Sequence, residues 1–295
     1  MVGERRIGLL GLVWRLPFFL LALSMFAPYY WMLIGAFKTV QELMQFPPTF
    51  WVHRFTLNNF WDPTPTAPLH TRGLFQYFER LPLRFGTFVA NSLATTAVNT
   101  VASLLIASAI AYVIAKRRVP GSNAVFLLIL SSMMIPWPVT IIPNFLTVKN
   151  LGWVNTYVGL TVPGWVSSFA VFFLRQYMLS IPDELIDAAR IDGAGDLRTW
   201  WTVVMPLIGP ALAALGIFAM LGNWNSFVWP LIIVQDSKLA TLPVAMAQLN
   251  AVMDSAMAYG VLMAGALLAS LPTMAFFLAF QRHFVESIAI TGIRA

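Results

Sequence analysis

The sequence predicts an all-α membrane protein with six transmembrane helices, and two observations carry that prediction. Hydrophobic residues make up 59% of the 295 residues and charged residues 10%, against roughly 45–50% and 25% in soluble domains. Six apolar segments are each long enough to cross a bilayer, which takes about 20 helical residues. The chain has no cysteine, which excludes disulfides, thiolate metal sites and cysteine nucleophiles.

The predicted spans are not all regular, because the third and fifth contain prolines and glycines. Transmembrane helices tolerate these residues when neighbouring helices satisfy the freed backbone groups. The N-terminal stretch is basic like a signal peptide, but its apolar run is long and lacks a small-residue cleavage site, so we expect a retained first span. The predicted spans lie near Leu16–Phe37, Phe85–Ala115, Ala124–Pro143, Thr156–Tyr177, Pro206–Val234 and Tyr259–Gln281.

The lysines and arginines predict that both termini are cytoplasmic. This orientation leaves seven lysines and arginines outside the cytoplasm. Five of these seven lie in or beside the long segment after the first span, where the positive-inside rule is weak. The net charge of +6 is scattered at the ends of apolar runs, which favours membrane topology over nucleic-acid binding. An N-inside chain has eleven of its eighteen basic residues in the cytoplasm: Arg5, Arg6, Arg15, Lys116, Arg117, Arg118, Arg175, Arg190, Arg198, Arg282 and Arg294.

This topology divides the chain into three parts. Residues 1–84 contain the first span and an extracytoplasmic insertion. Residues 85–281 form the core membrane domain, which includes a cytoplasmic loop at 181–206. Residues 282–295 form a cytoplasmic tail.

The insertion at 38–84 is rich in proline and aromatic residues, so we expect an irregular outer cap. A short interfacial helix is predicted near Leu74–Leu83. His53 and His70 stand alone in this loop. Isolated loop histidines are more often solvated than metal-bound, so no metal site is predicted.

The cytoplasmic loop at 181–206 is a charged island in an apolar protein. Pro182 suits a first helical position, and Gly193 is a natural helix stop at which we expect a positive φ. A second helix is predicted to follow, with Asp196 as its N-cap. The loop therefore forms a compact helix–turn–helix knob. It contains five of the twelve carboxylates: Asp183, Glu184, Asp187, Asp192 and Asp196.

The run Asp187-Ala188-Ala189, then Asp192-Gly193-Ala194, then Pro206 resembles the EAA loop of bacterial ABC-importer permeases. In that family the loop is the coupling helix that docks into a cleft on the cytoplasmic ATPase. Small alanines allow close approach, and a carboxylate can pair with a basic group of the partner. The departure is Asp187, where the family usually has Glu. The resemblance implies that the coupling residues are Ile186, Asp187, Ala188, Ala189, Asp192, Gly193 and Ala194.

Two further stretches resemble the sugar permeases of the maltose type. They are Asn91-Ser92-Leu93 with Ala111-Tyr112 and Lys116-Arg117, and the C-terminal Gln281-Arg282-His283-Phe284-Val285. The resemblance implies a type I ABC importer permease fold in the bacterial inner membrane. It also implies one half of a path for a sugar or oligosaccharide, a second homologous permease, two cytoplasmic ATPase subunits and an extracytoplasmic solute-binding protein. Glycerol phosphate is the alternative substrate.

Several kinds of chemistry are absent from the sequence. There is no Gly-x-x-x-x-Gly-Lys-Ser/Thr phosphate loop, so this chain does not hydrolyse ATP by that device. We expect no cofactor on this chain and no enzymatic activity, with ATP and Mg bound by the partner ATPase. The predicted spans contain no Asp or Glu, which argues against the rival hypothesis of an ion-coupled secondary transporter. A membrane-bound enzyme is the third hypothesis, and no catalytic constellation favours it.

A polar stripe on the second span is compatible with two roles. Asn91, Thr95, Asn99 and Ser103 recur every four residues on one helix face. Such a stripe either bonds to other helices or lines a water-filled path. Both interpretations stay open from the sequence.

A second candidate for the path is the run Gly222-Asn223-Trp224-Asn225-Ser226 in the fifth span. Amides and aromatic faces are the groups that bind sugars. Asn223 and Asn225 face one cavity only if Gly222 allows local unwinding, since they point about 200° apart on a helix. Otherwise one amide caps a kink and the other bridges to a neighbouring helix. Lys and Arg occur in the spans only at their ends, which favours a neutral sugar. The path candidates are Asn223, Trp224, Asn225, Trp229, Met133, Met134, Trp137 and Asn99.

Overall fold

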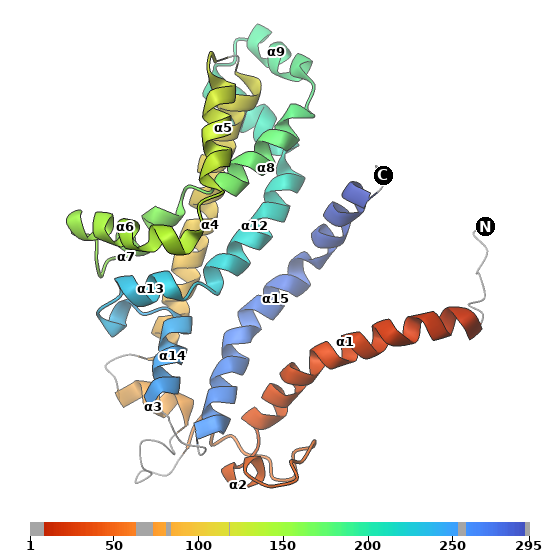
Figure 1. Cartoon of the computed structure of the whole chain (residues 1–295), viewed down its shortest axis with the longest axis vertical. Helices are drawn as coiled ribbons and strands as arrows, with labels where there is room; N and C mark the ends of the chain where they lie inside the picture. The colour runs from red at the N-terminus through yellow and green to blue at the C-terminus, as the bar shows by residue number, and fades with distance from the viewer. Residues whose placement is uncertain (1–8, 63–72, 81–83, 118, 253–257, 293–295) are drawn as a thin grey trace. The chain divides into compact units, whose positions relative to one another are not determined.

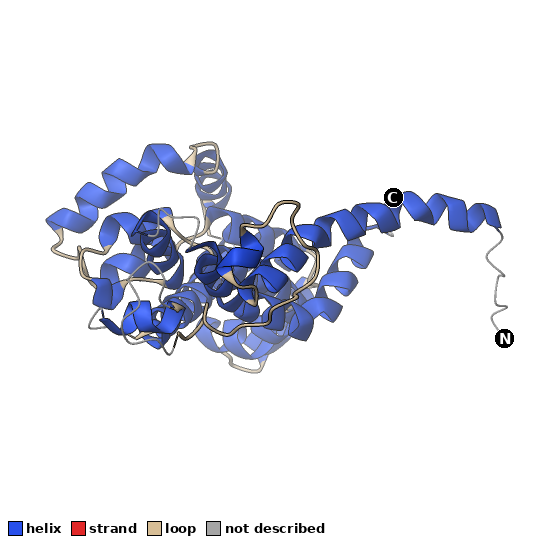
Figure 2. Ribbon diagram, turned by 90° about the horizontal axis from the view of Figure 1, so that it is seen from below, coloured by secondary structure: helices blue, strands red, loops and turns tan. Residues whose placement is uncertain are grey.

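The structure, a computed structural model, describes residues 9–62, 73–80, 84–117, 119–252 and 258–292. In this part of the chain every named element is a helix, as Figure 2 shows, and a single β-bridge joins Lys38 to Phe55. The chain separates into two compact units. Unit 1 comprises Met1–Phe85 with Met246–Leu271, and unit 2 comprises Gly86–Ala245 with Pro272–Ala295.

Unit 1 contains the N-terminal span and the insertion that follows it. The insertion is tied to the end of α1 by Asn59, whose amide donates to the carbonyls of Ala36 at 2.9 Å and Lys38 at 2.8 Å. Gly260 packs directly against the Asn59 side chain, where a Cβ would collide with the amide. The helices of this unit are α1 (Leu9–Ala36), α2 (Val40–Leu43), α3 (Leu74–Arg80), the second part of α14 (Leu242–Val252) and the first part of α15 (Tyr259–Gly292).

The insertion is organised around the buried carboxylate of Glu42. Its Oε1 accepts from the backbone N–H of His53 and the hydroxyl of Thr49, each at 3.0 Å. Its Oε2 accepts from the backbone N–H of Arg54 at 3.1 Å, and the buried Lys38 Nζ lies 3.9 Å from Oε1. Burial alone raises the pKa of Glu42. The hydrogen bonds and the Lys38 charge outweigh burial, so the pKa is lowered from 4.5.

The predicted irregular cap is therefore ordered locally. The predicted interfacial helix is α3, which is described as far as Arg80; residues 81–83 and His70 lie outside the described residues.

Unit 2 contains the remaining helices, and Figure 1 shows α9 at the Lys116 end of α4, with α13 toward its Phe85 end. The helices are α4 (Phe85–Lys116, its first residue in unit 1), α5 (Ser122–Ser132), α6 (Trp137–Asn150), α7 (Tyr157–Thr161), η2 (Val162–Gly164), α8 (Ser168–Leu179), α9 (Asp183–Ile191), α10 (Asp196–Thr199), the π-helix η3 (Trp200–Val204), α11 (Met205–Leu207), α12 (Gly209–Trp224), α13 (Val228–Ile233), η4 (Ser237–Leu239), the first part of α14 and the last part of α15.

All six predicted spans are present when each bent helix pair counts as one span. Three are single helices: Arg15–Ala36, Phe85–Lys116 and Tyr259–Ala279. The other three are bent, by 102° between Ser122–Ser132 and Trp137–Asn150, by 42° between Tyr157–Gly164 and Ser168–Leu179, and by 79° between Asp196–Leu207 and Gly209–Trp224.

The bends have local causes, and one corrects a predicted boundary. Pro136 precedes α6, and Ser167 caps α8 by accepting from the backbone N–H of Ala170 at 3.2 Å. Ile208 breaks the fifth span between two prolines, at 206 and 210. The fifth predicted span, near Pro206–Val234, differs in its bounds: the bent pair that matches it runs from Asp196 to Trp224, and α13 is a separate helix.

The main core of unit 2 lies at the α9 end. It joins Ala107 and Ala111 of α4 to Leu174 and Met178 of α8, and these four side chains are at most 1% exposed. Residues of α5, α9 and α12 pack in the same cluster. A smaller cluster of Val148, Leu160 and Ile233 joins α6, α7 and α13.

Candidate functional site

The charged island forms the expected knob, which is α9, the glycine turn and α10. The turn closes α9 by two backbone bonds, from Gly193 N to the Arg190 carbonyl at 3.0 Å and from Ala194 N to the Ala189 carbonyl at 2.9 Å. This is the Schellman pattern, and it needs a residue with positive φ at its centre. Gly193 has φ +76°, so the predicted helix stop is confirmed.

Two predicted helix starts are each shifted by one residue. Pro182 is the N-cap residue of α9, so it precedes the first helical position, Asp183. Gly195 is the N-cap of α10, and Asp196 is the first helical residue. The predicted capping role of Asp196 is therefore wrong, and its carboxylate is engaged instead by Arg117.

The knob has one buried face and one exposed face. Ile186 is 2% exposed and packs in the main core of unit 2, so it seats α9 on the membrane domain. Asp187, Ala188, Asp192 and Gly193 are exposed, and Ala189 and Ala194 are half-buried. Two large apolar side chains, Ile191 and Leu197, are 87% and 75% exposed. Charged and apolar groups displayed together on a rigid knob are suited to docking a partner protein.

Asp187 is held within the knob by Arg190. Arg190 lies about one helical turn after Asp187, and its Nη1 donates to Asp187 Oδ1 at 3.1 Å. Both side chains are about half exposed. The pair is thus open to a competing charge from a partner.

The polar stripe on α4 divides into groups with different roles. Asn91 donates to the carbonyls of Lys238 at 2.8 Å and Ala240 at 2.9 Å. These hydrogen bonds join α4 to the segment around η4. The hydroxyls of Thr95 and Ser103 donate to carbonyls of their own helix, at 2.8 Å and 3.1 Å. Asn99 differs, because its Oδ1 is buried and has no hydrogen-bond partner.

Gly222 does not unwind the fifth span, because α12 stays helical through Trp224. Asn223 donates to Thr100 Oγ1 of α4 at 3.3 Å. Asn225, the C-cap residue, donates to the Leu221 carbonyl at 2.8 Å. One amide bridges to a neighbouring helix and the other caps the helix end, which is the alternative that the sequence left open.

The aromatic and methionine candidates have different surroundings. Trp224 is 4% exposed. Trp229 donates from Nε1 to the Gly159 carbonyl at 3.0 Å, which ties α13 to α7. Met133, Met134 and Trp137 come from the bend between α5 and α6 and are 43%, 83% and 50% exposed.

Sequence reasoning missed Trp165, at the bend of the fourth span. Its indole Nε1 is buried without a hydrogen-bond partner. The neighbouring Gly164 is close to the Asn99 amide, since a Cβ at Gly164 would lie 3.8 Å from Asn99 Nδ2. The Pro163-Gly164 pair was the available sequence signal, since it marks a break in the span.

The middle of α4 therefore meets the fourth-span bend and the end of α12. Thr100 accepts a hydrogen bond from Asn223, and Asn99 is a near neighbour of Gly164. This place, called the polar junction below, contains an unpaired acceptor on Asn99, and the next residue after Gly164, Trp165, carries an unpaired donor. Buried polar groups without partners are unusual.

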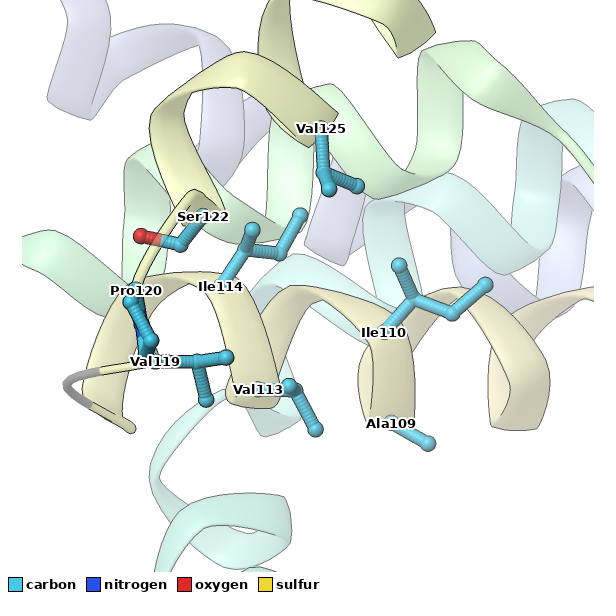
Figure 3. A pocket seen from close by; sticks show the side chains of 8 residues that line it. All are labelled: Ala109, Ile110, Val113, Ile114, Val119, Pro120, Ser122 and Val125. Carbon is cyan, nitrogen blue, oxygen red and sulfur yellow. The ribbon is translucent and has the colours of Figure 1, made fainter.

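An apolar hollow of about 340 Å³ lies near the Lys116 end of α4, between α4 and α5 (Figure 3). Its walls include Val113, Val119 and Val125, and Ser122 supplies the hydroxyl among its lining side chains. A sugar needs several hydrogen-bonding groups, so this hollow does not suit a sugar.

The comparisons with known proteins agree with the fold. A family described as "Binding-protein-dependent transport system inner membrane component" matches residues 99–290, and the chain belongs to this family of ABC importer permeases. It is a transport subunit of the bacterial inner membrane and not an enzyme. A permease of this kind works with an ATPase and a solute-binding protein.

Particular relatives include sugar permeases. The chain is 32% identical to the arabinooligosaccharides transport system permease protein AraQ of Bacillus subtilis, over 94% of this chain and 93% of that protein. It is 37% identical to AraQ of Halalkalibacterium halodurans, over 71% and 75%. It is 36% identical to the sn-glycerol-3-phosphate transport system permease protein UgpE of Yersinia enterocolitica, over 69% and 73%.

A solved structure shares the fold. It is a chain of a bacterial ABC transporter involved in the import of the acidic polysaccharide alginate. The TM-score is 0.79 at 21% identity, over 96% of this chain and 99% of that chain.

Proposed function

We propose that this chain forms one half of the translocation path of an ATP-driven importer for a neutral sugar or oligosaccharide. The observation that carries the proposal is the knob, which displays Asp187 and Ile191 of the Schellman-closed α9 and Leu197 of α10 to solvent. Membership of the permease family supports it, since a permease of that family needs a contact with its ATPase.

The proposed assembly has two permeases and two ATPase subunits. The described part of the chain carries one knob, and two ATPases need two docking elements. The second knob is assigned to a second, homologous permease that closes the path from the other side, within membrane lipid. A solute-binding protein delivers the substrate from the extracytoplasmic face. ATP and Mg are bound by the ATPase pair, and this chain takes no cofactor.

The substrate class rests on two observations. The AraQ relatives are named for arabinooligosaccharides, and one of them matches 94% of this chain. The polar junction offers an unpaired acceptor and an unpaired donor, on Asn99 and Trp165, that suit hydroxyl groups. In the proposed path they act with the candidates Asn223, Trp224, Asn225, Trp229, Met133, Met134 and Trp137.

Glycerol phosphate is the second candidate, supported by the UgpE relatives. An anion needs a cation on its path, and Arg175 is the basic residue inside a predicted span that comes nearest to this role. Its guanidinium stacks on Phe126, 3.8 Å from the ring centroid, and donates to Asn123 at the start of α5 at 3.4 Å. Arg175 is thus engaged at the end of its span, which favours the neutral substrate.

The experiment is uptake by the reconstituted importer. The chain, its partner permease, the ATPase pair and the solute-binding protein are placed in proteoliposomes with ATP inside. We expect uptake of labelled pentose or hexose oligosaccharides and none of sn-glycerol 3-phosphate. Uptake of the phosphate alone would reverse the substrate assignment. Failure of the chain to copurify with an ATPase would overturn the proposed role of the knob.

A further inference from the structure

Two adjacent cations at the end of α4 hold the two ends of the knob. Lys116 is the last residue of α4, and its side chain is 3% exposed. Its Nζ donates to the Ile181 carbonyl and to Asp183 Oδ1, each at 2.6 Å. Both acceptors lie at the start of α9, so Lys116 fixes where the knob begins.

Arg117 fixes the other end of the knob. Its Nη1 pairs with Asp196 Oδ2, on the first residue of α10. The two side chains are 39% and 49% exposed. Asp183 and Asp196 enclose α9 and the Gly193 turn, so the entire knob is tied at both ends to one membrane helix.

The two contacts differ in how strongly they resist separation. The ammonium of Lys116 is withdrawn from water, so it is costly to part from its acceptors. The Arg117–Asp196 pair is partly solvated and contributes little stability, but it sets the orientation of the knob relative to α4. A partner that moves the knob must therefore move the end of α4 as well.

The same helix reaches the polar junction. α4 is an unbroken helix of 32 residues, about 48 Å long at 1.5 Å per residue. Thr100, half-way along it, accepts the hydrogen bond from Asn223, and Asn99 is a near neighbour of Gly164. A continuous helix with contacts at both places is the kind of element that carries coupling between distant sites.

We propose that Lys116 and Arg117 form a clamp that transmits movement of the knob through α4 to the polar junction. The proposal rests on the proposed function, because it assumes that an ATPase moves the knob. Lys116 and Arg117 are positioning residues, since they act through the knob and contact neither substrate nor nucleotide. Their loss uncouples ATP hydrolysis from uptake while the ATPase stays attached.

The test is charge reversal in the complete importer in proteoliposomes. Arg117→Asp and Asp196→Arg each break the exposed pair, and the double variant restores it with opposite polarity. We expect each single variant to lower the sugar taken up per ATP hydrolysed by about tenfold, within the range typical of coupling between two sites. The double variant is expected to recover most of that ratio. Lys149→Asp reverses an exposed cation on α6, outside the clamp, and is the matched control.

A purely structural role predicts a different outcome. If the single variants reduce copurification with the ATPase, and the double variant does not restore the uptake ratio, the clamp is wrong. Wild-type ratios in both single variants also overturn it. Lys116→Met provides a second test, with the same expected uncoupling and retained ATPase attachment. Absence of uptake or of ATPase attachment in the wild-type importer would instead overturn the proposed function, so the two failures are distinguishable.

Discussion

The phenol of Tyr157 donates a hydrogen bond to Asn91 Oδ1 over 2.6 Å, joining the start of α7 to the first turns of α4. The amide nitrogen of Asn91 is satisfied by the carbonyls of Lys238 and Ala240. All the polar atoms of this buried side chain are therefore occupied by the protein itself. Asn91 holds unit 2 together, and it does not offer a group to substrate.

The first prediction tests this structural role. Tyr157→Phe should lower the free energy of unfolding by about 0.5–1.5 kcal/mol, because one hydrogen bond is lost. Asn91→Leu should cost more, since it leaves the Lys238 and Ala240 carbonyls and the Tyr157 hydroxyl without partners. Thermal unfolding in detergent measures both effects. Lost uptake at wild-type thermal stability would instead place Asn91 on the path.

The second prediction concerns the exposed carboxylate of the knob. Asp187→Lys should insert and fold normally, because the site is solvent-exposed and its pair with Arg190 is local. It should abolish uptake and weaken attachment of the ATPase, because a cation would face a basic group of the partner. Asp187→Asn, which removes the charge without reversing it, should give a smaller loss. Copurification and uptake are the measurements, and normal values for the Lys variant exclude docking through Asp187.

The third prediction uses the two glycines of the turn. Gly193 has φ +76°, while Gly195 has an ordinary φ of −70°, and a Cβ would meet nothing within 4 Å at either position. Gly193→Val should therefore be strained by roughly 1–2 kcal/mol for backbone reasons alone. Gly195→Ala needs no strained conformation. We expect Gly193→Val to impair uptake more than Gly195→Ala, and equal tolerance would argue against a required turn geometry.

The fourth prediction concerns the polar junction. Asn99→Leu and Trp165→Phe remove an unpaired acceptor and an unpaired donor, so neither breaks a protein hydrogen bond. Uptake should fall in both while thermal stability and ATPase attachment are retained. Trp224→Ala and Asn225→Ala should also lower uptake and keep the ATPase attached. However, Trp224 is buried and Asn225 caps α12, so these two variants should lose stability as well. If all four variants take up sugar at wild-type rates, the substrate path does not pass along these residues.

The fifth prediction is a pH dependence in the insertion. The pKa of Glu42 is lowered in the folded state, so its stabilisation is fully present above about pH 4.5 and is lost as the pH falls through the lowered pKa. Glu42→Gln places an amide donor against backbone N–H groups that now donate to a carboxylate. The variant should melt at a lower temperature than the wild type at pH 7. The gap should narrow below pH 4.5, and a gap independent of pH would contradict this account.

The six spans and the knob were predictable because each leaves a local signal. Length and hydropathy identify a span, and Gly193 after an amphipathic charged helix identifies its stop. The bends were less predictable. Proline and glycine indicate that a span is irregular, but the direction and the angle depend on which neighbours pack against each half.

The roles of individual polar side chains could not be predicted from the sequence. Asn91, Asn99 and Asn223 look equivalent in an apolar helix. One is fully bonded, one has an unpaired oxygen and one bridges to Thr100, because different elements pack opposite them. The hydrogen bonds of Glu42 could not be predicted from the sequence either, since irregular loops have no periodicity from which to infer contacts.

The exposed side chains of Ile191 and Leu197 have a consequence for the degradation of this protein in the cell. Side chains of this size, 87% and 75% exposed to solvent beside a charged helix, form the kind of surface that chaperones and proteases select. In the proposed assembly a bound ATPase shields them, whereas a chain made in excess leaves them uncovered. We therefore expect degradation to remove orphan copies, so that the steady-state abundance of this subunit follows the supply of its ATPase even at constant synthesis.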